Sequence, residues 1–500
     1  MFDLILANGT VYDGTGTPGV IQDVGIRGEK IQVLGDLSTA DAARRIDVGG
    51  KAVAPGFIDV HTHHNNEMDG GIVNIPDASN YLRQGVTTCV GGNCGGGAFP
   101  IGAHLEQVSG LEIRNNYAIL VGCNAARNRV LREERPATAE ELRQMCDLVR
   151  TGFDEGAIGL SSGVAYMPFL TVDELAAMSG VAADFGSFYA SHIRNEGERL
   201  HESIAEVIEV CRRSGAAGEI SHIKCYGRDN WGKSVQALEL IHQARDQGLD
   251  VTADQYPYTG CFTGLAGSVF GQETQIRARR HGGLEALLSV PELRQAAEAH
   301  FHQRLATLDD GAGIILAPLE PQPEFQGKTL AEYLAEHPGD PFRTTVELCA
   351  GGHVSAIYLA MCEDDVVTYM RDDHVLVASD GHLRVFDKGC SHPRNFGTFP
   401  RVLARYVREQ AVLTLEQAIN KMTAMPAHRL GLRHRGRIAP GMVADITVFA
   451  PATVQDHATF REGNAYATGI DLVLLAGSIA LQDDTPAARG YGRVLRRGEG

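Results

Sequence analysis

Long apolar runs and an excess of basic residues are both missing from this 500-residue chain. It contains no run of roughly 18 apolar residues, the length that a helix needs to cross a membrane. Lys and Arg number 45 against 62 Asp and Glu, which gives a formal net charge of −17. Binding to phosphate backbones requires clustered Lys and Arg. Neither a membrane nor a nucleic acid is therefore expected as a partner.

Paired cysteines are also missing. The ten cysteines are scattered singly, without the spacings of a disulfide framework or of a Cys-x-x-Cys zinc ribbon. Residues 1–9 carry no basic region and include Asp3, which is typical of a first strand and not of a signal peptide. We therefore expect reduced thiols and a cytoplasmic protein. No Gly-x-Ser-x-Gly motif is predicted on a strand-to-helix turn, which disfavours a serine hydrolase.

Helix-length stretches alternate with short strand-like runs through the middle of the chain. Helical periodicity is clear in residues 139–153, 171–185, 200–214 and 234–247. Capping boxes are indicated by Thr138 with Glu141 and by Thr171 with Glu174. Strands that alternate with helices predict a parallel sheet in an α/β fold. The length suits a TIM-type (β/α)8 barrel with an additional domain.

Both ends of the chain have a different pattern. Residues 2–11 and 23–33 alternate like antiparallel strands, and the alternation returns at 443–449 and 471–479. Because neither end alone makes an adequate sheet, we predict one small β-sandwich formed from both. Between residues 258 and 353 the rhythm is lost in a charged stretch too long for a plain loop, which predicts an inserted helical subdomain. The predicted boundaries are 1–54 and 429–500 for the sandwich, 55–428 for the barrel and 265–350 for the insertion.

The tripeptide His61-Thr62-His63 directly follows the apolar run of residues 52–60. Alternate residues of a strand point to the same side, so the two imidazoles share one target. Two histidines at the end of a strand are a ready metal site if further ligands arrive from elsewhere in the fold.

Further candidate ligands end other strand-like runs. They are Cys94, His192, His222 and Asp380, and helix-length stretches separate them. A barrel collects such residues at the carboxyl ends of its strands. A single strand histidine is usually an ordinary core residue, and a single buried cysteine is usually a small apolar side chain. Their repetition at successive strand ends favours a shared metal site.

The motifs around these residues resemble the amidohydrolase superfamily, and within it the N-acyl-D-amino-acid deacylases (D-aminoacylases). The resemblance covers nearly the whole chain in order. Its most diagnostic part is Cys94, where most members of the superfamily carry a carboxylated lysine or a glutamate. The matching segments are residues 59–63, 91–95, 191–196, 221–224, 254–258, 378–381, 392–401 and 442–446.

This resemblance implies a TIM-type barrel, a β-sandwich from both chain ends and an insertion near the active-site mouth. It also implies a zinc site. Cys94, His192 and His222 would hold a tightly bound zinc ion, and His61, His63 and Asp380, with Cys94 bridging, would line a second and weaker position. Zinc lowers the pKa of a bound water towards ~7, from ~9 for the aqueous ion. The zinc-bound hydroxide would attack the amide, and Asp380 would carry the proton to the departing nitrogen.

The resemblance further implies a small-molecule substrate, an N-acyl-D-amino acid that is cleaved into a carboxylate and a free D-amino acid. Four residues would hold the substrate α-carboxylate: Lys224, Arg394, Tyr256 and Tyr166. Arginine grips a carboxylate with two parallel hydrogen bonds, and lysine adds a point charge. Alternatively, Lys224 and Arg394 are surface charges or partners of acids such as Glu196, and Tyr166 is a loop packing residue.

Two departures from the family pattern bear on the substrate and the metals. Where deacylases usually continue with two acids, this chain has His64-Asn65, which removes negative charge beside the metals. Where acyl-D-glutamate members place an arginine, it has Val269. Together with the nearby Phe262, Leu265 and Phe270, this favours a neutral or apolar substrate side chain.

Two other functions stay open. One is a different amidohydrolase, either a cyclic amidase of the dihydroorotase or hydantoinase kind or a deaminase. The lack of a bridging-lysine motif disfavours it. The other is a catalytically silent barrel used for protein interaction, which the retention of every candidate ligand disfavours. Metal content separates this last alternative from an enzyme. The sequence carries no signal for the oligomeric state.

Overall fold

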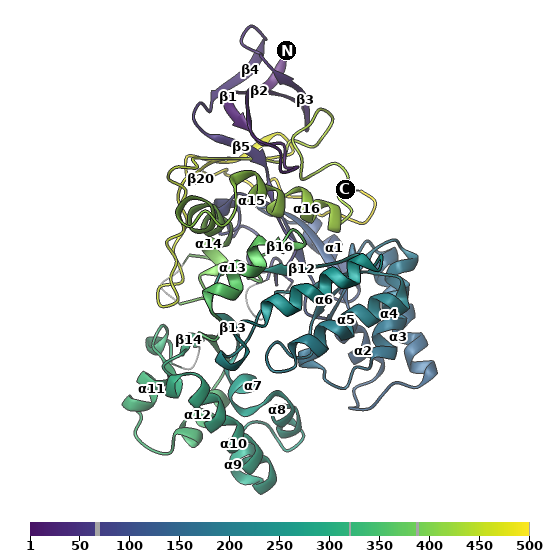
Figure 1. The fold of residues 1–500 in the computed structure, drawn as a ribbon, viewed down its shortest axis with the longest axis vertical. Coiled ribbons are helices and arrows are strands. Elements are labelled where there is room, and N and C mark those ends of the chain that lie inside the picture. Colours follow the sequence, from purple (N-terminus) through teal and green to yellow (C-terminus); the bar gives the residue numbers. More distant parts are fainter. Residues whose placement is uncertain (66–70, 320–321, 387–389, 500) are drawn as a thin grey trace.

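A computed structural model of the chain describes residues 1–65, 71–319, 322–386 and 390–499, and the strands in this part form three sheets (Figure 1). The central sheet is parallel and has the order β16-β12-β11-β10-β9-β8-β7-β6. Its strands are β6 (Phe57–Asp59), β7 (Val86–Gly91), β8 (Asn116–Gly122), β9 (Gly159–Gly163), β10 (Phe188–His192), β11 (Ala217–Ile220), β12 (Val251–Gln255) and β16 (Val375–Val377).

The first and last strands of this sheet meet beyond their carboxyl ends. The backbone N–H of His63 donates to the carbonyl of Gly381 over 2.8 Å, and the N–H of Asp380 donates to the carbonyl of His61 over 2.9 Å. A parallel bridge joins Thr62 and Gly381. The sheet therefore closes into the predicted TIM-type barrel, and it closes at the residues that were predicted to bind metal.

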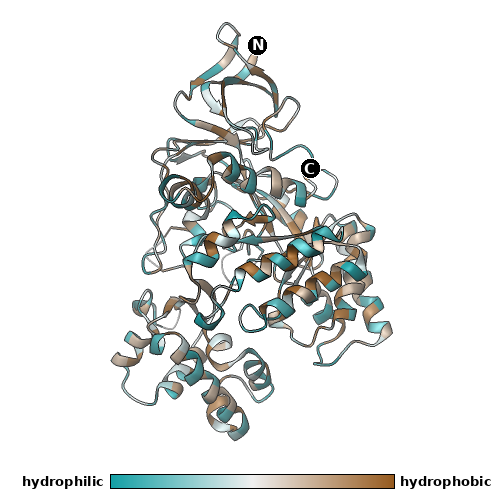
Figure 2. Cartoon of the chain, viewed as in Figure 1, coloured by the Kyte–Doolittle hydropathy of each residue, from teal (hydrophilic) through white to brown (hydrophobic). Residues whose placement is uncertain are grey.

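Helices between the strands cover the outside of the barrel. They are α1 (Ile101–Ser109), α2 (Cys123–Val130), α3 (Ala139–Asp154), α4 (Val172–Asp184), α5 (Leu200–Ser214), α6 (Ser234–Asp246) and α13 (Glu363–Arg371). Both predicted capping boxes are present, at Thr138 with Glu141 and at Thr171 with Glu174. The helices are brown on one face and teal on the other (Figure 2), because an amphipathic helix turns its apolar face to the sheet.

Strands from both chain ends share one sheet, as predicted. Its order is β20-β19-β18-β17-β5-β1-β2-β3, with β4 on β1, and the antiparallel pair β5 and β17 joins the two ends. Its strands are β1 (Phe2–Val11), β2 (Val20–Arg27), β3 (Lys30–Gly35), β4 (Ala42–Asp47), β5 (Ala52–Pro55), β17 (Ile446–Phe449), β18 (Ile470–Leu475), β19 (Ser478–Gln482) and β20 (Thr485–Pro486). Apolar residues of both ends, among them Leu6, Val24, Ile446 and Leu474, are fully buried in a shared core.

The segment between β12 and β16 carries a second, smaller body at the bottom of Figure 1. Its helices are α7 (Leu265–Phe270), α8 (Gln272–Arg279), α9 (Ala286–Ser289), α10 (Pro291–Thr307), α11 (Leu330–Glu336) and α12 (Pro341–Ala350). It also holds a sheet of order β13-β15-β14, whose strands are β13 (Cys261–Gly264), β14 (Ile314–Leu319) and β15 (Val354–Tyr358). The sequence predicted the helices and missed this sheet, because its strands are short and pair across long sequence separations.

After the barrel, three α-helices lead back to the shared sheet. They are α14 (Arg394–Arg401), α15 (Leu415–Met422) and α16 (Ala424–Arg429). A π-helical stretch, Val402–Glu409, continues α14. Among the described residues, no helix has both the length and the apolar character that a membrane crossing demands.

Candidate metal centre and active site

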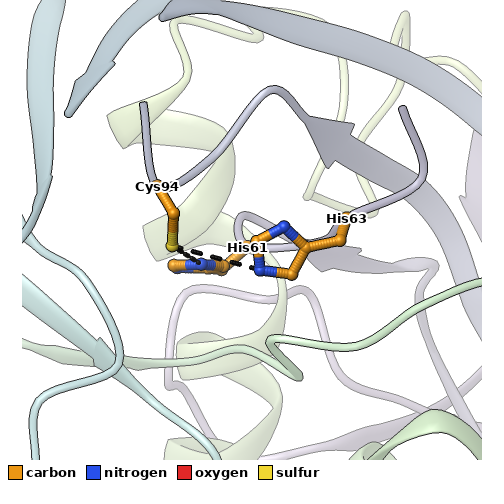
Figure 3. Close-up of side chains that lie close together, drawn as sticks. All are labelled: His61, His63 and Cys94. Atoms are coloured by element: carbon orange, nitrogen blue, oxygen red, sulfur yellow. Dashed lines mark hydrogen bonds between the residues drawn. The ribbon is translucent and has the colours of Figure 1, made fainter. Parts of the chain in front are cut away.

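The thiol of Cys94 lies at the centre of four histidines. Its Sγ is 3.5 Å from His61 Nε2, 3.6 Å from His192 Nδ1 and 3.5 Å from His222 Nε2, and it is 4.0 Å from His63 Nε2. Figure 3 shows the sulfur and the rings of His61 and His63 turned toward one another. These residues come from the ends of four different barrel strands, and the structure brings together all of the predicted ligands.

Three of the candidate ligands have a left-handed backbone that non-glycine residues rarely adopt. The φ angles are 53° at Cys94, 36° at His222 and 53° at Asp380. Such conformations cost about 1–3 kcal/mol each and persist where the surroundings enforce them. The N–H of His222, for example, donates to Asp254 Oδ1 over 2.9 Å. The strained turns redirect the chain at strand ends, so that the side chains face the barrel axis.

Glycine is required next to Cys94. Gly95 has a φ of 71°, and a Cβ at this position would lie 2.1 Å from Asn124 Oδ1 and 2.6 Å from the backbone nitrogen of Gly163. No other residue fits that space. The glycine that follows Cys94 is thus what allows the thiol to approach the histidines.

The cluster fits a zinc ion. Tetrahedral zinc with bonds of roughly 2.0 Å to nitrogen and 2.3 Å to sulfur holds its ligand atoms roughly 3.3–3.6 Å apart. The sulfur-to-nitrogen distances from Cys94 to His192 and His222 match that range, whereas the two histidine nitrogens, 2.9 Å apart, lie closer together than it requires. Thiolate and neutral imidazole are preferred zinc ligands.

Burial sets the protonation of these ligands. Burial lowers the pKa of His61 to about 3 and that of His192 well below its usual value, so both rings are neutral and offer lone pairs. Burial also raises the pKa of the Cys94 thiol well above its usual value, and the charge of Asp380 raises it further. A divalent cation supplies the opposing charge that a buried thiolate needs.

Asp380 joins the metal cluster to a buried arginine. Its Oδ1 is 2.9 Å from His63 Nε2 and 3.5 Å from His61 Nε2, and its Oδ2 accepts a 2.7 Å hydrogen bond from Arg394 Nη1. Burial alone would raise the pKa of this carboxyl, but Arg394 and the surrounding histidines outweigh it and hold the pKa well below its usual value. The carboxylate is therefore ionised at neutral pH and able to accept a proton.

The two predicted carboxylate-binding cations lie beside this cluster. Lys224 pairs with Glu196, and Arg394 pairs with Asp380, so each has an acidic partner in the site. Tyr256 lies between them, with its ring centroid 5.7 Å from Lys224 Nζ and 5.1 Å from the guanidinium carbon of Arg394. Its buried hydroxyl has no hydrogen-bond partner in the described part of the chain. A buried donor without a partner, between two cations, suits an anionic ligand.

Tyr166 lies at the rim of the same cavity. Its ring centroid is 4.7 Å from that of His192, and its side chain is partly exposed. The cavity has a volume of about 1040 Å³ and reaches from the metal cluster into the insertion. Tyr166, Tyr256, Lys224 and Arg394 all line it.

Two acidic residues position the histidines, and the sequence analysis gave them no role in the metal site. Asp254 Oδ2 is 3.4 Å from His61 Nδ1, which directs Nε2 of that ring to the centre. Glu196 Oε1 is 3.0 Å from His222 Nδ1 and does the same for the second ring. The available signal was that Asp254 ends a strand-like run and that Glu196 closely follows His192.

Other residues discussed from the sequence lie outside the cluster. The ring of His64 packs against Tyr81 at 4.5 Å, and Asn65 accepts the backbone N–H of Gly92, so neither enters the metal site. His392 also lies outside the cluster, where its Nδ1 accepts the backbone N–H of Arg394 over 3.1 Å and so orients this loop.

The geometry around Ser161 excludes a serine-hydrolase site at this residue. Residues 159–163 spell Gly-x-Ser-x-Gly, but they form strand β9 and not a strand-to-helix turn. Ser161 is fully buried, donates to the carbonyl of Gly92 and accepts from the N–H of Gly95. It is a structural support for the Cys94 loop.

The structure corrects one part of the predicted substrate pocket. Phe262 lines the cavity. Leu265, Val269 and Phe270, which were predicted to do so, are fully buried in the hydrophobic core of the insertion. Helix α7 turns Gly267 and Ser268 to the cavity instead. The physical reason is amphipathicity: the apolar residues of this short helix pack inward, so that its small and polar residues face the open side.

A parallel barrel with a histidine, cysteine and aspartate cluster at its carboxyl-terminal face defines a metal-dependent hydrolase of the amidohydrolase type. Residues 44–254 and 292–480 match the model of the amidohydrolase family. The chain belongs to this family, as the resemblance implied, and it is an enzyme of the hydrolase class.

Full-length relatives narrow the comparison. The chain is 38% identical over 520 residues to N-acyl-D-glutamate deacylase of Alcaligenes xylosoxydans xylosoxydans. This alignment covers 99% of this chain and 96% of the relative. It is 35% identical over 523 residues to D-aminoacylase of the same organism, and this alignment covers 99% of this chain and 98% of the relative. Its fold matches N-acyl-D-glutamate deacylase from Bordetella bronchiseptica, complexed with zinc and a phosphonate inhibitor, with a TM-score of 0.85 and 34% identity over 99% of each chain.

Proposed function

We propose that the protein is a zinc-dependent deacylase, which hydrolyses the amide bond of N-acyl-D-amino acids to a carboxylate and a free D-amino acid. One observation carries the proposal: the metal cluster around Cys94 shares a cavity with Lys224, Arg394 and the unpartnered hydroxyl of Tyr256. A reactive centre beside a carboxylate-binding group suits a substrate whose amide is adjacent to a carboxylate. The relatives named deacylases, and the zinc in one of their structures, support this chemistry.

In this proposal, Cys94, His192 and His222 hold one zinc ion tightly. His61, His63 and Asp380 line a second and weaker position, with Cys94 between the two. When bound, zinc supplies Lewis acidity and a water molecule of lowered pKa.

Asp380 is the proposed proton carrier. Its low pKa keeps it ionised at neutral pH, and its two oxygens face the histidines on one side and Arg394 on the other. A carboxylate in this place accepts a proton from the attacking water and delivers it to the departing nitrogen. This role requires that the carboxylate lie within hydrogen-bond reach of both the water oxygen and the amide nitrogen. The remaining carboxylate oxygen stays fixed by Arg394.

Lys224, Arg394, Tyr256 and Tyr166 are the proposed binding group for the substrate α-carboxylate. Substrate binding exchanges the present ion pair of Lys224 with Glu196 for a bond to the ligand, while Arg394 keeps its hydrogen bond to Asp380 and offers its other donors to the ligand. The carboxylate, the amide carbonyl and the side chain are then held at three points. Three fixed points select one enantiomer of the substrate.

The free thiols support a reducing compartment, since all ten cysteines are unpaired, and we propose a cytoplasmic location. For the domains, we propose a sandwich of residues 1–54 and 429–500, a barrel of residues 55–428 and an insertion of residues 265–350.

A hydrolysis screen tests the function. Paired N-acetyl-D- and N-acetyl-L-amino acids are incubated with the purified protein and added zinc, beside dihydroorotate, hydantoin and an aminopurine. The expected result is release of free D-amino acids only. Hydrolysis of the L-series alone, ring opening or ammonia release would refute the deacylase and favour another amidohydrolase. A protein purified without chelator that holds no zinc and cleaves nothing would favour a silent barrel.

A further inference from the structure

Helix α10 of the insertion presents a polar face to the active-site cavity. This face consists of His300, Gln303, Arg304 and Thr307. Residues three and four positions apart lie on the same side of a helix. The opposite face is buried in the core of the insertion and consists of Leu293, Ala297, Phe301 and Leu305. This part of the cavity wall is therefore suited to a polar group.

Arg304 is a cation without an acidic partner on this wall. Its Nε donates to the carbonyl of Ser268 over 3.3 Å, and its guanidinium carbon lies 5.0 Å from the ring centroid of Tyr226. Within the described residues, no carboxylate pairs with its guanidinium, and its two terminal nitrogens have no hydrogen-bond acceptor. The ring and the carbonyl hold the side chain in place while its outer donors stay available.

The other Lys and Arg residues that line the cavity are already paired. Lys224 pairs with Glu196, Arg394 with Asp380, Arg194 with Glu206 and Arg228 with Asp309. In the described part of the chain, Arg304 is thus the cavity cation whose charge no acid of the protein balances. A partly desolvated arginine in such a place binds carboxylates well, because its planar guanidinium donates two parallel hydrogen bonds.

Tyr226 connects Arg304 to the proposed carboxylate-binding group. The guanidinium carbon of Arg304 lies 5.0 Å from the centroid of its ring, and the backbone N–H of Tyr226 donates to the carbonyl of Glu196, the residue that pairs with Lys224. Lys224, Arg394 and Arg304 all line one cavity. A small molecule that spans this part of the cavity meets Lys224 and Arg394 at one end and Arg304 at the other.

We infer that Arg304 binds a second carboxylate of the substrate, so that the preferred substrates are N-acyl-D-amino acids with two anionic groups. This inference rests on the proposed deacylase function. The second carboxylate is carried by the amino-acid side chain, as in acidic D-amino acids, or by a dicarboxylic acyl group. In the first case it replaces the expectation of a neutral or apolar side chain. Three of the four residues behind that expectation, Leu265, Val269 and Phe270, pack away from the cavity.

Isosteric substrate pairs test the inference. For the side chain, kcat/KM is measured on N-acetyl-D-glutamate and on N-acetyl-D-glutamine, which has the same shape without the charge. For the acyl group, N-succinyl-D-alanine is compared with its succinamoyl counterpart. We expect the charged member of at least one pair to be favoured about 10- to 100-fold, the range of one charge-assisted hydrogen bond pair. The pair that shows the preference identifies which group carries the carboxylate.

Arg304→Gln should bring that preference close to one, while kcat/KM on the neutral member changes little. Arg304→Lys should retain part of it, because the charge stays and the planar donor pair is lost. Arg294→Gln is the matched control: Arg294 lies on the same helix, is half-exposed and pairs with Glu298. This control should keep the full preference.

The outcomes separate the inference from the function on which it rests. Hydrolysis of all four substrates without a charge preference, or a preference that survives in Arg304→Gln, overturns the inference and leaves the deacylase standing. Hydrolysis of none of them, by a protein that holds zinc, overturns the deacylase and with it the inference.

Discussion

The guanidinium of Arg394 donates to the carboxylate of Asp380 over 2.7 Å, and both side chains are more than nine-tenths buried. The pair couples the proposed substrate-binding group to the proposed proton carrier. Asp380 is thereby held ionised, and its second oxygen faces the metal cluster. A change at Asp380 should affect proton transfer and therefore kcat. A change at Arg394 should affect substrate binding and therefore KM.

Asp380→Asn should lower kcat on N-acyl-D-amino acids by about 10²- to 10⁴-fold, the range of a general base. The amide has nearly the same shape as the carboxylate but accepts no proton. Zinc bound by Cys94, His192 and His222 should remain. The measurement is steady-state kinetics together with zinc content. Asp173→Asn is the control, because this exposed acid pairs only with Arg213 on the surface. Unchanged kcat in Asp380→Asn would exclude Asp380 as the proton carrier.

Cys94→Ala should remove the ligand that both halves of the metal cluster share. We expect the zinc content of the purified protein to fall and the activity to fall with it. Zinc should also stop stabilising the fold, because an ion that binds the native state raises the midpoint of thermal unfolding. Cys146→Ala serves as the control, since Cys146 is a partly buried thiol of helix α3 outside the metal cluster. A variant that keeps wild-type zinc content and the same zinc-dependent midpoint contradicts the assignment.

Arg394→Lys should raise KM about 10- to 100-fold, the value of one charge-assisted hydrogen bond. Lysine keeps the charge and loses the planar pair of donors. Arg401→Lys is a matched control on the same helix, where the guanidinium lies over the ring of Tyr258 and binds Asp456. If KM stays constant in Arg394→Lys while kcat falls, the arginine serves Asp380 and not the substrate.

The metal cluster was predictable because its chemistry follows from strand geometry. His61 and His63 point the same way as alternate residues, and parallel strands of a barrel bring their carboxyl ends to one face. Cys94, His192, His222 and Asp380 each follow a strand-like run, so their meeting follows from the fold. The family resemblance added a prediction that strand ends alone do not make, namely which residues would share which ion.

The substrate pocket was less predictable, because it depends on which face of a short helix points to the cavity. Val269 and Phe270 lie next to Ser268 in the sequence, yet Ser268 lines the cavity and the other two are buried. Six residues are too few for a clear helical period. Arg304 lies more than 30 positions further along the chain, and only the packing of α10 beside α7 brings it to this wall.

Lys421 provides a prediction of pH-dependent stability away from the active site. Its side chain is buried and donates to the backbone carbonyls of Asp372 and Val375. Burial lowers its pKa from 10.5 to about 8. Between these values the unfolded chain binds a proton that the native protein has lost, so the free energy of unfolding rises with pH across this window. The rise amounts to about 3 kcal/mol in total.

Lys421→Met removes this group and should remove the rise. Denaturation midpoints of both proteins are measured in urea at pH 7 and pH 10, with zinc kept constant. The wild type should gain stability relative to the variant at the higher pH, because the buried ammonium becomes neutral there. Lys328→Met, at an exposed lysine paired with Glu336, should follow the wild type. Parallel midpoints for the wild type and Lys421→Met at both pH values would mean that Lys421 titrates alike in the folded and unfolded chains.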